Sequence, residues 1–210
     1  IILGVCIRFT NLDGQVYWHD ETFTSLAISV HTIEELRRDI FNNQIIPISH
    51  LDIYQYINPD RNIGDTLRYL KESDPQHPPL YYSLIRLWAQ FFGDSPVQLR
   101  SLSAIISLII FPSIYWFCLE LFESSQIGYI SLALIAVSPF HLLIAQEARQ
   151  YSLWTVMFIL SSAALLRAMR KDTISSWAIY SLTLCLGLYT HLLTILILFA
   201  HTTYITIQQW

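Results

Sequence analysis

Four short polar clusters interrupt the apolar stretches of this chain and carry the side chains best suited to chemistry. They are Trp18-His19-Asp20-Glu21, His77-Pro78-Pro79, Gln146-Glu147-Ala148-Arg149-Gln150-Tyr151 and Tyr189-Thr190-His191. Placing an ionisable group at membrane depth costs roughly 2.5–3.5 kcal/mol of insertion free energy, so ionisable residues found there usually have a function. Glu147 and Arg149 are the clearest cases.

The residue types in these clusters suit proton transfer and anion binding. A carboxylate such as that of Asp20 can take the proton of a hydroxyl group as the hydroxyl oxygen attacks. A cation in a water-poor site stabilises growing negative charge more strongly than in bulk water, and Arg149 is the best candidate for that role. His77 precedes two prolines at a helix start, where an anion is favoured, and Arg100 could assist it.

Each of these residues also has a structural interpretation. Asp20 stands where a helix N-cap would stand, and Glu147 and Arg149 could be a structural ion pair or interfacial anchors. His77 could simply cap a helix, and His191 in a turn between helices could be structural. Glu147, His77 and His191 are conceivable metal ligands, but three scattered residues do not establish a metal site, and no other cofactor is indicated.

The elements that position these clusters are predicted to be membrane helices. Hydrophobic residues make up 53% of the 210 residues, charged residues only 13%, and the mean hydropathy is +0.42. After Arg100 the chain has charge-free runs of 19, 23, 17 and 38 residues, and roughly 20 apolar residues span a bilayer. We therefore expect an all-α, polytopic bundle with helices at about 100–119, 126–145, 150–168, 174–190 and 192–208.

The N-terminal half is expected to be mostly outside the membrane. Residues 1–8 are interpreted as the end of a truncated first helix, and residues 9–99, with 12 acidic and 6 basic residues, as a loop in water. Apolar residues at three-to-four spacing predict one amphipathic helix from Phe23 to Leu36. A second helix, Leu80–Phe92, is too short to cross and is expected to lie along the membrane.

Charge gives the orientation and excludes some functions. Arg167, Arg170 and Lys171 lie between two expected helices, and the positive-inside rule places them in the cytoplasm. Alternation then puts all four polar clusters on the extracytoplasmic face. A net charge of −4 without a basic tract argues against a nucleic-acid partner. Cys6, Cys118 and Cys185 form neither a disulfide framework nor a CxxC motif.

Ordered motifs along the chain resemble a known family. WHDETFTSLA, HPPLYYSLIRLWAQFFGDSPVQLRSLSAI, SPFHLLIAQEARQYSL and LGLYTHLL are similar to the N-terminal part of the GT-C membrane glycosyltransferases, in particular the protein O-mannosyltransferases and the lipid A aminoarabinose transferase. The resemblance implies inverting transfer of a sugar from a polyprenyl-phosphate carrier on the extracytoplasmic side. It also implies an essential aspartate, which maps onto Asp20, with Glu21 as the second choice.

The resulting hypothesis is a glycosyltransferase embedded in a bacterial plasma membrane. Its donor phosphate and substrate would be held by the remaining polar side chains, namely His77, Arg100, Arg149, Glu147, Tyr151 and His191. The acceptor, which could be a protein, a lipid or a glycan, is left open. Two alternatives stand beside this hypothesis: a transporter or flippase subunit, and a protein that binds lipid-linked sugar without catalysis.

Overall fold

The computed structural model describes residues 1–208, and within them the chain forms helices and connecting loops but no strand, which confirms the expected all-α class. The helices are α1 (Ile2–Phe9), α2 (His19–Ser29), α3 (Ile33–Ile40), the 3-10 helix η1 (Ile48–Leu51), α4 (Asp52–Gln55), α5 (Ile63–Ser73), α6 (Pro79–Phe92), α7 (Pro96–Ser107), α8 (Ile110–Phe122), α9 (Ser125–Ala136), α10 (Pro139–Ala145), α11 (Tyr151–Lys171), α12 (Ile174–Leu188) and α13 (Thr194–Gln208). Residues 209 and 210 lie outside the described part.

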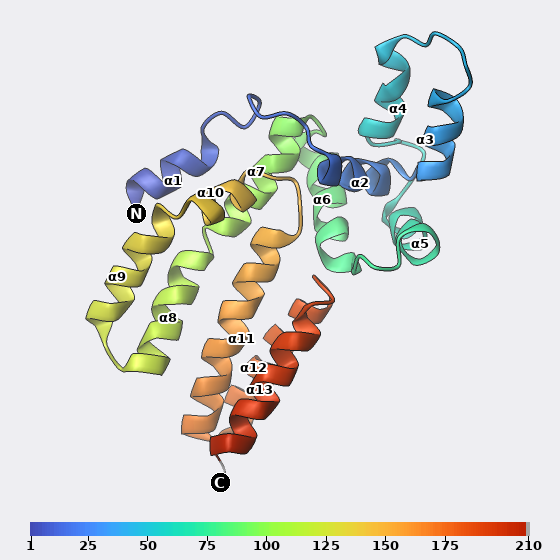
Figure 1. The fold of residues 1–210 in the computed structure, drawn as a ribbon. Helices are drawn as coiled ribbons and strands as arrows, with labels where there is room; N and C mark the ends of the chain where they lie inside the picture. The colour runs from blue at the N-terminus through green and yellow to red at the C-terminus, as the bar shows by residue number, and fades with distance from the viewer. Residues whose placement is uncertain (209–210) are drawn as a thin grey trace.

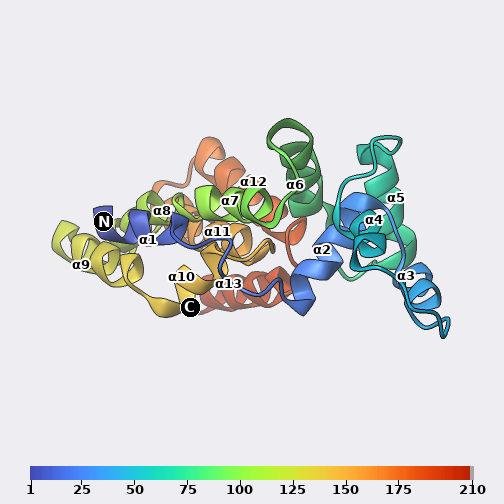
Figure 2. The same cartoon turned by 90° about the horizontal axis from the view of Figure 1, so that it is seen from above.

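The helices form an elongated molecule with two parts (Figure 1). Helices α8, α9, α11, α12 and α13 run beside one another (Figure 1). Helix α7 leads into α8 at one end of this bundle, and α10 packs against α7 there. Helices α2 to α6 extend from that same end. Seen from above, α3, α4 and α5 occupy one end of the molecule and α9 the other (Figure 2).

Two helices among residues 1–208 are long and apolar enough to cross a membrane alone. They are Pro96–Phe122, which comprises α7 and α8, and α11. A third span is available if α9 and α10 act together, although their axes are bent by 61°. Helices α12 and α13, each of 15 residues, are apolar but shorter.

The bend between α9 and α10 interrupts what the sequence predicts as one helix over 126–145. Pro139 has no amide hydrogen and restricts the residue before it, so helical hydrogen bonding stops there. The carbonyls of Ile135 and Ala136 at the end of α9 are instead satisfied by the buried guanidinium of Arg8, at 3.3 and 3.1 Å. Arg8 therefore stabilises the broken end of α9, where the helix dipole also favours a cation.

The single amphipathic helix predicted from Phe23 to Leu36 was wrong, because the structure has two helices there. Val30 adopts the left-handed conformation, with φ 63° and ψ 45°, and ends α2. Thr32 then starts α3 through a capping box, in which its hydroxyl accepts from the Glu35 amide and the Glu35 carboxylate accepts from the Thr32 amide. The apolar spacing continues across this break, so periodicity alone did not reveal it.

The extended part is joined to the bundle through buried side chains of α6. On one face of α6, Tyr82 packs with residues of α2, α4 and α5. On another, Tyr81 and Ile85 pack with α7 and with Ala148 of the loop between α10 and α11. This shared core fixes α2, and with it Asp20, against the end of the bundle.

Candidate active site

Asp20 lies in the first turn of α2, in a position where its carboxylate is partly accessible. Its side chain is 30% exposed, and Oδ2 accepts a hydrogen bond of 3.0 Å from the Tyr151 hydroxyl. Asp20 does not cap the helix, because it lies within α2 and the N-cap residue is Trp18, whose amide donates to the carboxylate of Glu21. The other oxygen of Asp20, Oδ1, lies 3.7 Å from Nδ1 of the exposed His19, so the Asp20 carboxylate is not taken up by the end of the helix.

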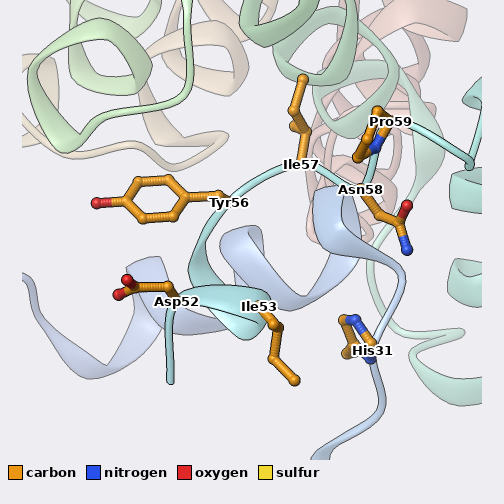
Figure 3. Close-up of a pocket in the computed structure, with 7 residues that line it drawn as sticks. All are labelled: His31, Asp52, Ile53, Tyr56, Ile57, Asn58 and Pro59. Carbon is orange, nitrogen blue, oxygen red and sulfur yellow. The ribbon is translucent and has the colours of Figure 1, made fainter. Parts of the chain in front are cut away.

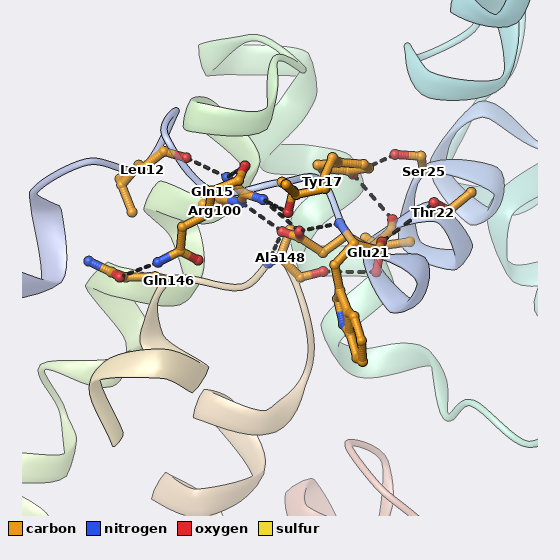
Figure 4. A network of polar contacts seen from close by, with 12 residues as sticks. Leu12, Gln15, Tyr17, Glu21, Thr22, Ser25, Arg100, Gln146 and Ala148 are labelled. Atoms are coloured by element: carbon orange, nitrogen blue, oxygen red, sulfur yellow. Dashed lines mark hydrogen bonds and ion pairs between the residues drawn. The ribbon is translucent and has the colours of Figure 1, made fainter. Parts of the chain in front are cut away.

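Glu21 and Arg100, by contrast, form a fully buried ion pair (Figure 4). Arg100 donates through Nε and Nη2 to the two carboxylate oxygens at 2.8 and 2.7 Å. The Ala148 amide also donates to Glu21 Oε1, at 2.9 Å. Arg100 further donates to the carbonyls of Leu12, Gln15 and Val16. These bonds connect the loop before α2, α2 itself, α7 and the loop between α10 and α11.

Because this pair is buried, removing one partner is expected to destabilise the protein strongly. Arg100→Met should lower the free energy of unfolding by about 3–5 kcal/mol, since it leaves Glu21 charged and unpaired. The double variant Arg100→Met and Glu21→Gln should lose less free energy of unfolding than the two single variants lose in sum. Unfolding of the purified full chain in mild detergent measures both effects.

Arg68 provides the matched control for this prediction. Its ion pair with Asp65, at 3.5 Å, is on the surface, and the Arg68 side chain is 67% exposed. Arg68→Met should change the free energy of unfolding by about 1 kcal/mol or less. Equal effects at Arg68 and Arg100, or additive effects of Arg100→Met and Glu21→Gln, would contradict the prediction.

Arg149 is a buried cation that has no carboxylate partner among residues 1–208. Its Nη1 donates to the main-chain oxygen of Asp20 and to the Tyr82 hydroxyl, each at 3.0 Å, and Nη2 lies 3.1 Å from His77 Nε2. Its guanidinium group also lies over the ring of Tyr151, 5.7 Å from the centroid. The Nε group is buried without a hydrogen-bond acceptor. Such a group is suited to an anion brought by a ligand.

Glu147 does not form the ion pair with Arg149 that their spacing in the sequence suggests. The two residues are joined only through the main chain, by the Arg149 amide and the Glu147 carbonyl at 2.8 Å. Burial, and then the nearby carboxylates of Glu21 and Asp20, raise the pKa of Glu147 above its usual range. The folded protein therefore holds a proton on Glu147 at a higher pH than the unfolded chain does.

We expect Glu147→Gln to stabilise the protein at neutral pH. The raised pKa means that stability is lost as the pH rises through the folded-state value, because the folded state binds more protons than the unfolded state. Glutamine cannot lose a proton, so the gain in thermal stability should be larger at pH 7.5 than at pH 4.5. Glu72→Gln, which changes an exposed residue of α5, is the control. A variant less stable than the wild type at both pH values would refute the expectation.

The cluster around His191 adjoins Arg149 and Tyr151. The His191 ring stacks on Trp154, with centroids 4.8 Å apart, and lies 6.2 Å from the ring of Tyr151. Its Nδ1 accepts a hydrogen bond from the Leu193 amide, which leaves Nε2–H as the donor of the neutral ring. Burial, and then His77 and Arg149, lower the pKa of His191 and favour this neutral form.

The start of α6 is tied to the same region. The Leu80 amide donates to the Tyr189 carbonyl at 2.9 Å, which places His77 and the turn after α12 at one end of the bundle. All four polar clusters predicted from the sequence thus meet there. The side of the membrane on which this end lies remains a prediction.

The three conceivable metal ligands do not form a metal-binding group. Among residues 1–208, no three His, Cys, Asp or Glu side chains are arranged to hold a metal ion. Both ring nitrogens of His77 already have partners, Asp74 and Arg149, and Nδ1 of His191 accepts from a backbone amide. As arranged, these residues do not fit a metal.

A cavity of about 460 Å³ lies elsewhere, beside α4 and the segment that follows it (Figure 3). Its lining includes His31, Ile53, Tyr56 and Ile57, and none of its lining residues belongs to the four polar clusters. The volume of this cavity therefore does not identify the site. The arrangement of Asp20, Arg149 and their neighbours does.

The comparison with protein families agrees with this arrangement. The family model described as dolichyl-phosphate-mannose-protein mannosyltransferase matches residues 76–210, well over half of the chain. The chain belongs to this family. Comparisons with curated proteins and with solved structures gave no match.

Membership of the mannosyltransferase family makes the chain a membrane protein and an enzyme of the glycosyltransferase type. The matched segment includes most of the predicted site residues, namely His77, Arg100, Glu147, Arg149, Tyr151 and His191. It does not include Asp20 or Glu21. Their link to the site rests on their contacts with Tyr151, Arg149 and Arg100.

Sequence reasoning did not identify two residues that contact this site. Tyr82 accepts from Arg149 and donates to Gln150 at 3.3 Å. Asp74 contacts His77 with Oδ2 only 2.6 Å from Nδ1. The spacing Asp74-Pro75-Gln76-His77 is a turn pattern that could have indicated the second contact. Nothing in the sequence distinguishes Tyr82 from the neighbouring Tyr81.

Proposed function

We propose that this site transfers a sugar from a polyprenyl-phosphate donor to a hydroxyl group of an acceptor, with inversion at the anomeric carbon. One observation carries the proposal: a partly exposed carboxylate, Asp20, lies beside a buried cation, Arg149, that has no carboxylate partner in residues 1–208. Arg149 is bonded to the main-chain oxygen of Asp20, so the two groups are held together. A base next to an anion site is what this transfer requires.

In the proposed reaction the acceptor oxygen forms a bond to the anomeric carbon and loses its proton to the Asp20 carboxylate. The bond between the anomeric carbon and the phosphate oxygen breaks, and its electron pair stays on that oxygen. The polyprenyl phosphate leaves with one more negative charge than it had in the donor. Arg149 would stabilise this charge, and its burial makes the interaction stronger than it would be in water.

The neighbouring side chains have supporting roles in this proposal. Tyr151 orients the carboxylate of Asp20 through its hydroxyl. His191 offers Nε2–H as a further donor to the phosphate or the sugar. Glu147, which lacks a side-chain partner among the described residues, would accept hydrogen bonds from sugar hydroxyls. Glu21 and Arg100 satisfy each other, so we assign them to holding the site together.

The position of the site supports an enzyme over a transporter. Transporters commonly place their polar residues near the bilayer midplane, whereas these clusters lie at helix ends. The basic residues Arg167, Arg170 and Lys171 lie at the opposite end of α11. By the positive-inside rule this distribution favours an extracytoplasmic site.

The test is donor turnover by the full-length protein in proteoliposomes. Polyprenyl-phosphate mannose and other polyprenyl-phosphate sugars are supplied singly, and released polyprenyl phosphate is measured together with the anomeric configuration of the product. Release that requires an acceptor and inverts the configuration supports the proposal. Binding of these donors without release would instead identify a non-catalytic binder, and retention of configuration would refute the role of Asp20.

A further inference from the structure

Asp74 is a buried carboxylate whose only side-chain hydrogen bond among residues 1–208 is to His77. It follows the last residue of α5 and is 5% exposed. A turn closed by the His77 amide and the Asp74 carbonyl, at 3.1 Å, brings the two side chains together. Asp74 Oδ2 then lies 2.6 Å from His77 Nδ1. A carboxylate this close to a histidine controls where the ring proton is held.

The contact on the other side of the ring determines the direction of each hydrogen bond. Arg149 carries only donors, so His77 Nε2, 3.1 Å from Arg149 Nη2, must be the acceptor. The ring proton is therefore on Nδ1, and it is donated to Asp74. The opposite tautomer would place two N–H groups against each other at the Arg149 contact and would leave Asp74 without its donor.

We infer that Asp74 is a positioning residue that holds His77 in the Nδ1–H tautomer and thereby orients the guanidinium group of Arg149. Arg149 Nη2 donates to His77, and Arg149 Nη1 donates to Tyr82 and to the Asp20 carbonyl. These three contacts fix the plane of the guanidinium group. The buried Nε–H is left without an acceptor among the described residues. The catalytic consequence of this arrangement rests on the proposed function.

The charges around His77 agree with this assignment. Asp74 faces the ring from the end of α5, Arg149 from the loop between α10 and α11, and Tyr82 from α6, with ring centroids 5.6 Å apart. Arg149 has no carboxylate of its own in the described chain, and the neutral ring connects it to the negative charge of Asp74. Comparable carboxylate–histidine pairs orient the ligands of metal sites in other proteins.

Two measurements on the full-length protein test the inference. In the first, ¹⁵N NMR of ring-labelled histidine reports the tautomer of His77, assigned by the signal that His77→Gln removes. We expect Nδ1–H in the wild type and a shift toward Nε2–H in Asp74→Asn. This readout requires no substrate, so it decides the tautomer even if the proposed function fails.

The second measurement is a double-mutant cycle on donor turnover. Asp74→Asn should lower kcat roughly 10- to 100-fold, as outer-shell partners do in metal sites, with little change in the KM for the donor. In a His77→Gln background, where the glutamine oxygen can still accept from Arg149, Asp74→Asn should have no further effect. Asp65→Asn, on the same helix, is the matched control and should leave turnover unchanged.

Three outcomes would overturn the inference. An Nε2–H tautomer in the wild type would reverse the assigned hydrogen bonds. Unchanged kcat in Asp74→Asn would remove the positioning role. An equal loss in the His77→Gln background would show that Asp74 acts through the end of α5 rather than through His77. Absence of turnover in the wild type would refute the proposed function, and the NMR result would still decide the tautomer.

Discussion

Asp20→Asn is expected to lower sugar transfer by roughly 10²- to 10⁴-fold, the usual contribution of a positioned general base. Asparagine keeps the shape of the side chain and can still accept the hydrogen bond from Tyr151, but it cannot take the acceptor proton. The loss should therefore appear in kcat, with folding and donor binding preserved. Released polyprenyl phosphate, measured at saturating donor, gives the result.

The control for this change is Asp13→Asn, an exposed aspartate in the loop before α2. It should have no effect on transfer. Glu147→Gln provides a second comparison, because Glu147 is a second carboxylate near Asp20. The two are close enough for Asp20 to contribute to the raised pKa of Glu147. Normal turnover by Asp20→Asn together with loss in Glu147→Gln would move the base to Glu147.

Arg149→Gln should reduce kcat by about 10²- to 10³-fold, which is typical when one preorganised group that stabilises transition-state charge is removed. Arg149→Lys should not restore activity. A lysine has a single ammonium group, which cannot reproduce the planar set of contacts to His77, Tyr82 and the Asp20 carbonyl. Steady-state kinetics with a polyprenyl-phosphate donor distinguish these variants.

Arg37→Gln, on the exposed face of α3, is the matched control and should leave kcat unchanged. The affinity for polyprenyl phosphate, used as the probe, should also fall in Arg149→Gln. If kcat and this affinity were both unaffected, the assignment of Arg149 to the phosphate would be refuted.

The sequence predicted which helices exist better than where they break. Long charge-free runs require helices, because a bilayer leaves no other partner for backbone polar groups. The break at Ser138 and Pro139 was visible as a proline. The break at Val30 was not visible in the sequence, because a β-branched residue rarely adopts the left-handed conformation. Val30 nevertheless adopts it here. The capping box Thr32-Glu35 was the only local signal.

For the site, the sequence identified the residues but not their partners. Glu147 and Arg149 are two positions apart, and Glu21 and Arg100 are 79 positions apart, yet only the distant pair forms an ion pair. Burial determines the difference: Arg100 reaches Glu21 across a shared core, whereas the Arg149 side chain contacts Asp20, Tyr82 and His77 instead of Glu147. Spacing along the chain carries no information about such contacts.

The bonds of Glu21 also impose an order on how the protein is made. The carboxylate of Glu21 needs Arg100 and the amide of Ala148, and the latter lies 127 residues further along the chain. At a synthesis rate of 5–20 residues per second, that amide leaves the ribosome roughly 6 to 25 seconds after Glu21 does. Arg100 emerges earlier than Ala148, and until it does α2 has no partner for its buried charge. The bonds of Glu21 are thus complete only after α7 and the loop between α10 and α11 have been made, so the site forms late in synthesis although α2 is made early.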